Sequence, residues 1–245
     1  MEGDKLIAKE LLKQNFDAFG WEYSDEIGNR LDSYAEMLVE WNKRINLTAI
    51  TEPDDIVIKH FLDSILLLKA AELPKDATLI DVGTGAGFPS LPVCVVRNDL
   101  HPTLLDSLNK RLIFLEEVCK NIKVNAKFVH ARAEEAGQKR EYREQYDIAT
   151  ARAVAHLREL SEYCLPFVKE GGIFVALKGY EIEDELEEAK YAISQMGGKV
   201  ETIQKYELPR DNKRSIVVVR KFRQTPAKYP RMSAKIKKSP LNYNK

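Results

Sequence analysis

Three alternate glycines follow a short apolar run in the segment LIDVGTGAGFPSLP, residues 79–92. Gly83, Gly85 and Gly87 can adopt positive φ and let a ligand approach the backbone without a Cβ in the way. In the dinucleotide fingerprint G-x-G-x-x-G, the third glycine packs the helix on the strand, and the helix N-terminus receives a pyrophosphate. Here the third glycine comes one position early and Phe88 occupies the last position. The loop therefore predicts a nucleotide-like cofactor and disfavours NAD or FAD.

Acidic residues follow this loop at spacings that suit an adenosine. Asp106 lies 23 residues after Gly83, close to the ~20-residue offset at which a carboxylate accepts hydrogen bonds from a ribose. S-adenosylmethionine carries that adenosine and has a methionine tail instead of phosphates. We expect Asp81 on the ammonium side of the tail, directly or through water, and Ala133 with Glu134 at the adenine edge. Singly, Asp106 would also suit a helix cap and Glu134 an exposed first turn, but together with the loop they predict S-adenosylmethionine as cofactor.

Seven short apolar runs are the elements that would position these residues. Most of the segments between the runs have helical periodicity. Such alternation predicts an α/β fold with a mostly parallel, seven-stranded sheet whose strands are buried on both faces. The last two runs leave no room for a crossover helix, so we expect an antiparallel end to the sheet. The expected strands are residues 78–82, 102–105, 126–130, 147–150, 173–178, 200–206 and 215–220.

The first seventy residues have helical periodicity instead. Ser24 can begin one helix, and Pro53 suits the first turn of the next. The segment between them, WNKRINLTAIT, is expected to be a loop. His60 and Asp63 stand one helical turn apart, and we expect them to hold these helices to the sheet rather than to transfer protons.

Length and composition limit the class of protein. The 245 residues, 44% of them hydrophobic, suffice for one substantial core with a smaller appendage. The start, MEGDKLIAKE, lacks the apolar stretch of a signal peptide, and no run approaches the ~18 apolar residues of a membrane span. We therefore expect a cytoplasmic protein with no membrane contact, and a monomer because no long amphipathic seam is present. Three scattered cysteines predict buried thiols and no metal site.

Charge is unevenly distributed, although the formal net charge is zero. Eleven basic residues and no acidic residue follow Asp211, so the rest of the chain has an excess of eleven acidic residues. Such asymmetry suggests a polyanion partner for the basic end, or else a solvated terminus of poor order. The expected boundaries are 1–72 for an N-terminal helical extension, 73–222 for the main domain and 223–245 for a basic tail.

Several further segments share one order along the chain: WNKRINLTAIT, HFLDSI, DVGTGAGFPSLP, TLLDSLNKRLIFL, ARAEE, ATARAVAHL and ALKG, with YPRMSAKIKKSPL in the tail. Together they resemble the successive motifs of the bacterial ribosomal RNA small subunit methyltransferase G family, also called glucose-inhibited division protein B. The resemblance extends from Trp41 to Lys178 and more loosely through the tail. It implies a class I S-adenosylmethionine-dependent methyltransferase with a Rossmann-like fold that modifies N7 of one guanine in 16S ribosomal RNA. One departure is Ser90, where the family commonly has glycine.

The resemblance also implies roles for individual residues. Arg152 would join the cofactor and target sites as the catalytic residue, either by holding the methionine carboxylate or by donating to guanine O6. The implied cofactor contacts are Gly83, Phe88, Asp106, Ser107, Ala133, Glu134 and Arg152. RNA phosphates, in 16S ribosomal RNA or the small ribosomal subunit, would be bound by Lys110, Arg111, Lys178, Arg231, Lys235, Lys237 and Lys238.

The motifs that the sequence lacks agree with chemistry at guanine N7. The fourth expected strand ends in TARAV, without the [DN]PP[YFW] motif typical of attack by exocyclic amino groups or the cysteine typical of attack by pyrimidine C5. N7 has an available lone pair and no proton to lose, so it needs neither a general base nor a covalent nucleophile. We expect in-line displacement that yields S-adenosylhomocysteine, with positioning supplying roughly 7 to 11 kcal/mol.

Three other functions stay open at this point. The first is a small-molecule methyltransferase of the same fold, in which the basic tail is incidental. The second is a nicotinamide-dependent oxidoreductase whose loop tolerates Phe88, and the third is a non-catalytic RNA-binding protein with a relic cofactor site.

Overall fold

The computed structural model describes residues 6–152 and 155–242. Ala153 and Val154, within ATARAVAHL, lie outside the described residues, as do the first five residues of the expected extension and the last three of the expected tail.

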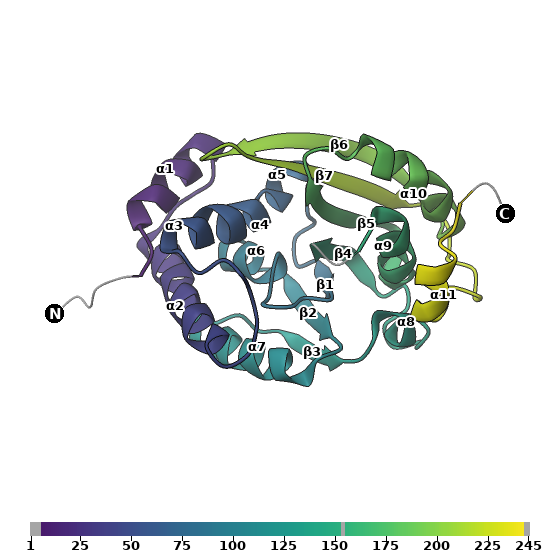
Figure 1. Ribbon diagram of the computed structural model, residues 1–245, viewed down its shortest axis with the longest axis horizontal. Coiled ribbons are helices and arrows are strands. Elements are labelled where there is room, and N and C mark those ends of the chain that lie inside the picture. Colours follow the sequence, from purple (N-terminus) through teal and green to yellow (C-terminus); the bar gives the residue numbers. More distant parts are fainter. Residues whose placement is uncertain (1–5, 153–154, 243–245) are drawn as a thin grey trace.

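Seven strands form one sheet in the order β3-β2-β1-β4-β5-β7-β6 (Figure 1). The pairs among β1 to β5 are parallel, and β7 is antiparallel to both β5 and β6. The expected seven-stranded, mostly parallel sheet with an antiparallel end is therefore confirmed. The order reverses between β1 and β4, and in such sheets ligands bind outside the carboxyl ends of the strands at this point. The strands are β1 (Thr78–Val82), β2 (His101–Asp106), β3 (Lys127–His130), β4 (Tyr146–Arg152), β5 (Val168–Gly179), β6 (Gly198–Leu208) and β7 (Asn212–Lys221).

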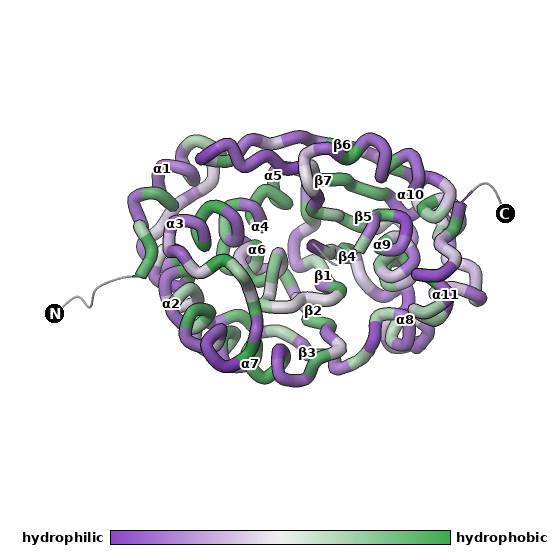
Figure 2. The backbone as a smooth tube through the Cα atoms, in the orientation of Figure 1, coloured by the Kyte–Doolittle hydropathy of each residue, from purple (hydrophilic) through white to green (hydrophobic). Residues whose placement is uncertain are grey.

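Helices cover both faces of the sheet, because successive strand residues point to opposite sides. Leu79 packs into the core under the N-terminal helices, whereas Ile80 packs into the core on the other face. The first face carries α1 (Lys9–Phe19), α2 (Asp25–Asn42), α3 (Pro53–Ile56), the π-helical turn η1 (Val57–Leu62), α4 (Asp63–Ile65), α5 (Leu67–Ala70), α6 (Ser90–Val96) and α7 (Asn109–Asn121). The second face carries α8 (Ala133–Ala136), α9 (Leu157–Cys164), the 3-10 turn η2 (Leu165–Phe167), α10 (Glu183–Gln195) and α11 (Ser233–Lys238). Figure 2 shows hydrophobic residues concentrated on the central strands, while much of the periphery is hydrophilic.

The N-terminal helices share the core of the main domain. Ser24 Oγ accepts a hydrogen bond from the Ile27 amide at 3.2 Å, so it caps α2 as its sequence position suggests. Arg30 donates to the Ile122 carbonyl at 2.7 Å and thereby links α2 to the end of α7. Tyr34, also on α2, is fully buried. The helical extension is therefore a structural part of the sheet's first face.

The described part of the C-terminal tail is packed onto the other face, beside α8 and α9 (Figure 1). Arg143 donates to the carbonyls of Thr225 and Tyr229 at 2.6 and 2.8 Å. Lys221, which is fully buried, donates to the Thr225 hydroxyl. Ile236 of α11 is fully buried. The described tail is therefore packed against the main domain, although several of its side chains are exposed.

The three cysteines, Cys94, Cys119 and Cys164, are free and buried. This confirms the predicted buried thiols. None of the helices in the described ranges is long and apolar enough to cross a membrane.

Gly87 lies where the glycine loop meets the helices of the first face. Its φ is +96°, and a Cβ there would lie 2.5 Å from Tyr34 Oη, 2.8 Å from Leu91 and 2.9 Å from Leu115. Tyr34 Oη also donates to the Ala86 carbonyl. Packing against α2 as well as the backbone conformation therefore requires glycine here.

We predict that Gly87→Ala lowers the free energy of unfolding by about 2 to 5 kcal/mol. Positive φ costs a residue with a Cβ about 1–2 kcal/mol, and crowding in a packed core typically adds about 1–3 kcal/mol. Urea denaturation followed by circular dichroism measures the loss. Gly171→Ala is the matched control, because Gly171 has φ +81° and no atom within 4 Å of the Cβ position. Equal losses in the two variants would contradict the packing role of Gly87.

Candidate functional site

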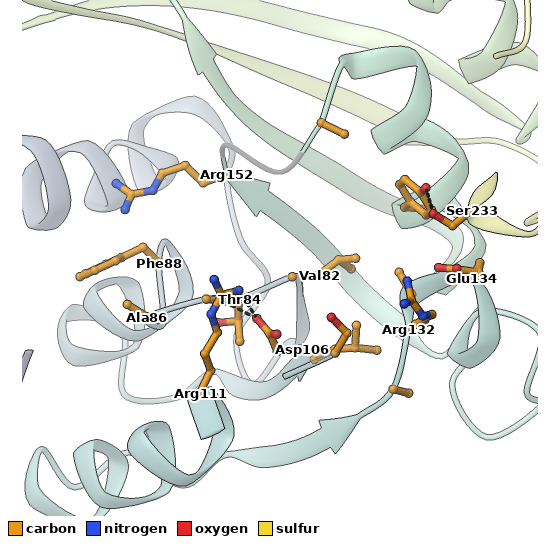
Figure 3. A pocket seen from close by; sticks show the side chains of 18 of the residues that line it. Val82, Thr84, Ala86, Phe88, Asp106, Arg111, Arg132, Glu134, Arg152 and Ser233 are labelled. Atoms are coloured by element: carbon orange, nitrogen blue, oxygen red, sulfur yellow. Dashed lines mark hydrogen bonds and ion pairs between the residues drawn. The ribbon is translucent and has the colours of Figure 1, made fainter. Parts of the chain in front are cut away.

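A cavity of about 470 Å³ lies at the carboxyl ends of β1, β2 and β4. Figure 3 shows Arg152 and Phe88 on one side, Glu134 and Ser233 on the other, and Asp106 between them. Eight of the ten predicted cofactor contacts line it, while Asp81 and Gly87 do not. The eight are Gly83, Gly85, Phe88, Asp106, Ser107, Ala133, Glu134 and Arg152.

The glycine loop bends around the end of β2. Gly83 and Gly85 have φ of +71° and +61°, values that glycine adopts without a steric cost. The amides of Gly83 and Thr84 donate to the Leu105 carbonyl at 2.9 and 3.0 Å. The turn therefore brings a stretch of backbone with no Cβ at two positions to the cavity, as the sequence predicts.

Asp106 connects this loop to the start of α7. Its Oδ2 accepts from the Gly85 amide at 2.9 Å and from Arg111 at 3.3 Å, while Oδ1 accepts from the Leu108 amide at 2.9 Å. A carboxylate offers about four acceptor positions, so one stays available. Because Asp106 lines the cavity, this position suits a ribose hydroxyl.

Asp81 lies beneath the loop and is fully buried. Its Oδ2 accepts from the hydroxyls of Ser90 at 2.6 Å and Thr84 at 2.9 Å, and Oδ1 has no partner among the described residues. Burial raises the pKa of Asp81 to about 7, although the hydrogen bonds from Ser90 and Thr84 oppose this shift. Because Asp81 is buried and does not line the cavity, any contact between it and a cofactor would run through water. Ser90, the departure from the family pattern, donates its hydroxyl to Asp81.

Arg152 ends β4 and lies against the π-helical turn η1. Its Nη1 donates to the Lys59 carbonyl at 2.9 Å and to Asp63 Oδ2 at 2.8 Å, and its Nη2 donates to His60 Nδ1 at 2.9 Å. Asp63 also accepts from Arg214 of β7 at 2.8 Å. His60 and Asp63 thus hold the helical extension to the sheet, as the sequence suggests. Nε and one Nη2 hydrogen of Arg152 are left to donate.

Phe88 forms the base of this corner of the cavity. The His60 ring stacks on it at 4.3 Å between centroids, and the Arg152 guanidinium lies 4.8 Å from the ring centroid. Burial and the Arg152 charge lower the pKa of His60 to about 3. The imidazole is therefore neutral, with Nδ1 as acceptor and Nε2 donating to Thr48 Oγ1 at 2.8 Å.

The opposite side of the cavity holds a second set of polar groups. Glu134 is 5% exposed, and no residue of the described ranges donates a hydrogen bond to its carboxylate. Tyr163 and Ser233 share a hydrogen bond of 3.0 Å between their hydroxyls, and both line the cavity with Lys237 of α11. Sequence reasoning missed four residues around the cavity, because no local pattern marks their contacts: Tyr163, Ser233, Tyr34 and Thr48. Thr48 does fall within the quoted segment WNKRINLTAIT.

The predicted RNA-binding residues divide into two groups. Three form contacts within the chain: Arg111 with Asp106 at 3.3 Å, Lys178 with Glu185 at 2.5 Å, and Arg231 with the buried Glu162 at 2.6 Å. Four are exposed and have no ion pair within the described ranges: Lys110, Lys235, Lys237 and Lys238. Phosphate binding by the first group would compete with these existing contacts.

The buried carboxyl of Asp81 makes stability depend on pH. Because its folded pKa is about 7 against an ordinary value of 3.8, the folded chain keeps a proton that the unfolded chain loses. The free energy of unfolding therefore falls as the pH rises from about 4 to about 7, by at most about 1.4 kcal/mol per pH unit. We predict that Asp81→Asn gains stability relative to the unsubstituted chain across this interval, measured by urea denaturation at a series of pH values. A difference independent of pH would refute the assignment.

Comparisons with known proteins agree with this geometry. A family model described as rRNA small subunit methyltransferase G matches residues 27–217. The ribosomal RNA small subunit methyltransferase G of Acetivibrio thermocellus is 49% identical over 98% of this chain and 100% of the relative. The protein of that name from Clostridium perfringens is 47% identical over 95% of this chain and 98% of the relative.

Two solved structures share the fold at low sequence identity. TYW2 of P. horikoshii in complex with MeSAdo has a TM-score of 0.52 at 16% identity, covering 66% of this chain and 62% of that chain. TrmN from Thermus thermophilus has a TM-score of 0.50 at 18% identity, covering 65% and 47%. The observed architecture is that of a class I S-adenosylmethionine-dependent methyltransferase, which confirms the predicted fold class. The chain belongs to the ribosomal RNA small subunit methyltransferase G family.

Proposed function

We propose that this chain is an S-adenosylmethionine-dependent methyltransferase of small subunit ribosomal RNA that methylates N7 of one guanine in 16S ribosomal RNA. Membership of the family supports an RNA methyltransferase. The N7 position comes from the sequence resemblance and from the chemistry of the site. The monomeric state and the cytoplasmic location stay predictions.

The cavity suits the proposed cofactor along its whole length. Asp106 has an acceptor position left for the ribose, and the Glu134 carboxylate at the far side has no partner among the described residues. Gly83 and Gly85 allow close approach beside Arg152. When bound, S-adenosylmethionine would supply an electrophilic methyl group: a nucleophile in line with the C–S bond takes the methyl, and the sulfur leaves as S-adenosylhomocysteine.

One observation carries the proposal: a second cavity of about 320 Å³ shares His60 and Arg152 with the lining of the first. Lys178, Leu177 and Arg214 also line this second cavity. A base placed there would reach the methyl group past Arg152, whose two remaining donors can serve the methionine carboxylate or guanine O6. Catalysis would then depend on holding the two reactants in line.

We predict that Arg152→Ala lowers methyl transfer to 16S ribosomal RNA at least tenfold, equivalent to about 1.4 kcal/mol in barrier height. Arg152→Lys should also be impaired, because a lysine cannot contact Lys59, Asp63 and His60 together with a ligand. Incorporation of labelled methyl groups into RNA and mass spectrometry of 7-methylguanosine measure the effect.

The matched control is Arg220→Ala. Arg220 pairs with Glu201 on the surface at 2.8 Å and lies opposite Ile173, at the other end of the β5–β7 pairing. This variant should methylate normally. Transfer by Arg152→Ala within a factor of two of the unsubstituted chain would overturn the role of Arg152. Loss of a different methylated base in cells without the gene would overturn the N7 assignment.

Lys110, an exposed lysine next to Arg111 of the cavity lining, tests the proposed RNA contact. We predict that Lys110→Ala makes the slope of log RNA affinity against log salt less negative by about 0.7 to 0.9, because one phosphate contact is lost. Lys120→Ala, at the other end of α7, should leave the slope unchanged, and filter binding at several salt concentrations measures both. If small acceptors are methylated while RNA binding is insensitive to salt, the small-molecule alternative is correct. A thermal shift with NAD and none with S-adenosylhomocysteine would favour the oxidoreductase.

A further inference from the structure

The described C-terminal segment completes the far end of the first cavity. Ser233 and Lys237 line the cavity together with Glu134 and Tyr163. Figure 3 shows Ser233 and Glu134 on the side opposite Phe88 and Arg152. Ser233 begins α11, and its hydroxyl bonds to that of Tyr163 on α9 at 3.0 Å. Two of the last thirteen residues of the chain therefore lie in the same cavity as the glycine loop.

We propose that the segment 225–241 is part of the cofactor site and that Ser233 and Lys237 bind the adenine end of S-adenosylmethionine. This assignment rests on the proposed cofactor. It gives the basic tail a function beside its expected contact with RNA.

The segment is attached firmly enough for this role. Arg231 donates to the buried Glu162 through Nε and Nη2, at 2.8 and 2.6 Å, and through Nη1 to the Ser239 carbonyl at 3.0 Å. These two contacts bracket α11, because Arg231 precedes the helix and Ser239 follows it. A buried, doubly hydrogen-bonded ion pair has a defined geometry. The position of Ser233 is therefore fixed relative to α9 before any ligand binds.

More contacts hold the preceding residues. Gln138 donates to the Pro230 carbonyl at 2.9 Å, and Tyr229 is 5% exposed. Within α11, Ile236 is fully buried and packs into the core of the second face. Lys237 stands next to Ile236 and is exposed, with no ion pair in the described ranges. Its ammonium is free to bind a ligand in the cavity that it lines.

The polar groups gathered here match the edge of an adenine. An adenine presents an exocyclic amino donor and ring-nitrogen acceptors. Glu134 can accept from the amino group, because its carboxylate has no donor among the described residues. Of the Tyr163 and Ser233 hydroxyls, one donates to the other, so one hydroxyl hydrogen stays available for a ring nitrogen. Lys237 adds a charged donor on the same side of the cavity.

Isothermal titration of the full chain with S-adenosylhomocysteine and with adenosine tests the proposal without RNA. In Ser233→Ala/Lys237→Ala we expect both affinities to fall at least fivefold and by the same factor, because adenosine retains the edge that the tail would contact. Lys228→Ala is the matched control, since Lys228 is an exposed lysine of the same segment and does not line the cavity. Its S-adenosylhomocysteine affinity should equal that of the unsubstituted chain.

A folded Ser233→Ala/Lys237→Ala chain that binds S-adenosylhomocysteine within twofold of the unsubstituted chain would overturn the proposal. Loss of affinity for S-adenosylhomocysteine but not for adenosine would also overturn it. If the double variant unfolds, Lys237→Met replaces one exposed side chain by another of similar length, and at least a threefold loss is expected. Failure of the unsubstituted chain itself to bind S-adenosylhomocysteine would instead refute the proposed cofactor.

Discussion

The guanidinium of Arg152 is the contact on which the arrangement of the two cavities depends. It stands at the carboxyl end of β4, and three of its five N–H donors are taken by Asp63, His60 and the Lys59 carbonyl. A buried charge without partners is strongly destabilising. The carboxyl end of β4 therefore requires the helical segment that supplies the partners of Arg152. The sheet and the N-terminal helices are therefore one unit at the site.

The π-helical turn η1 explains how one short segment presents three partners to one cation. Lys59, His60 and Asp63 lie within and just after Val57–Leu62, and π-helical turns are frequent at functional sites. Asp63 is shared with Arg214, so β7 is tied to the same point. His60 in turn stacks on Phe88 and fixes the end of the glycine loop. The glycine loop, the turn η1 and the strands β4 and β7 are thus all held by contacts with Arg152, His60 and Asp63.

The parts of the structure that the sequence predicted depend on local patterns. Each expected strand is a short apolar run, and Asp106 was identifiable because the fold fixes its distance from Gly83. The missed contacts join residues far apart in the chain: Arg231 and Glu162 are separated by 69 positions, and Tyr34 and Ala86 by 52. No local periodicity reports such pairs. Gly87 illustrates the same point, since its spacing suggested ligand contact, whereas its Cβ position faces Tyr34.

The state of the ionisable groups around the cavities bears on the kind of nucleophile they can serve. His60 is neutral, but its Nδ1 accepts from Arg152 and Nε2 carries the proton, so it cannot accept another. Asp63 holds two arginines, and Asp106 accepts three hydrogen bonds. Glu134 has no partner within the described ranges, but it lies at the end of the first cavity away from Arg152. Among the described residues, an acceptor that must lose a proton before attack would find no suitable base beside Arg152, which lines both cavities. A ring nitrogen with a free lone pair needs none, and this agreement between the hydrogen bonding of the site and the chemistry of guanine N7 supports the proposed reaction.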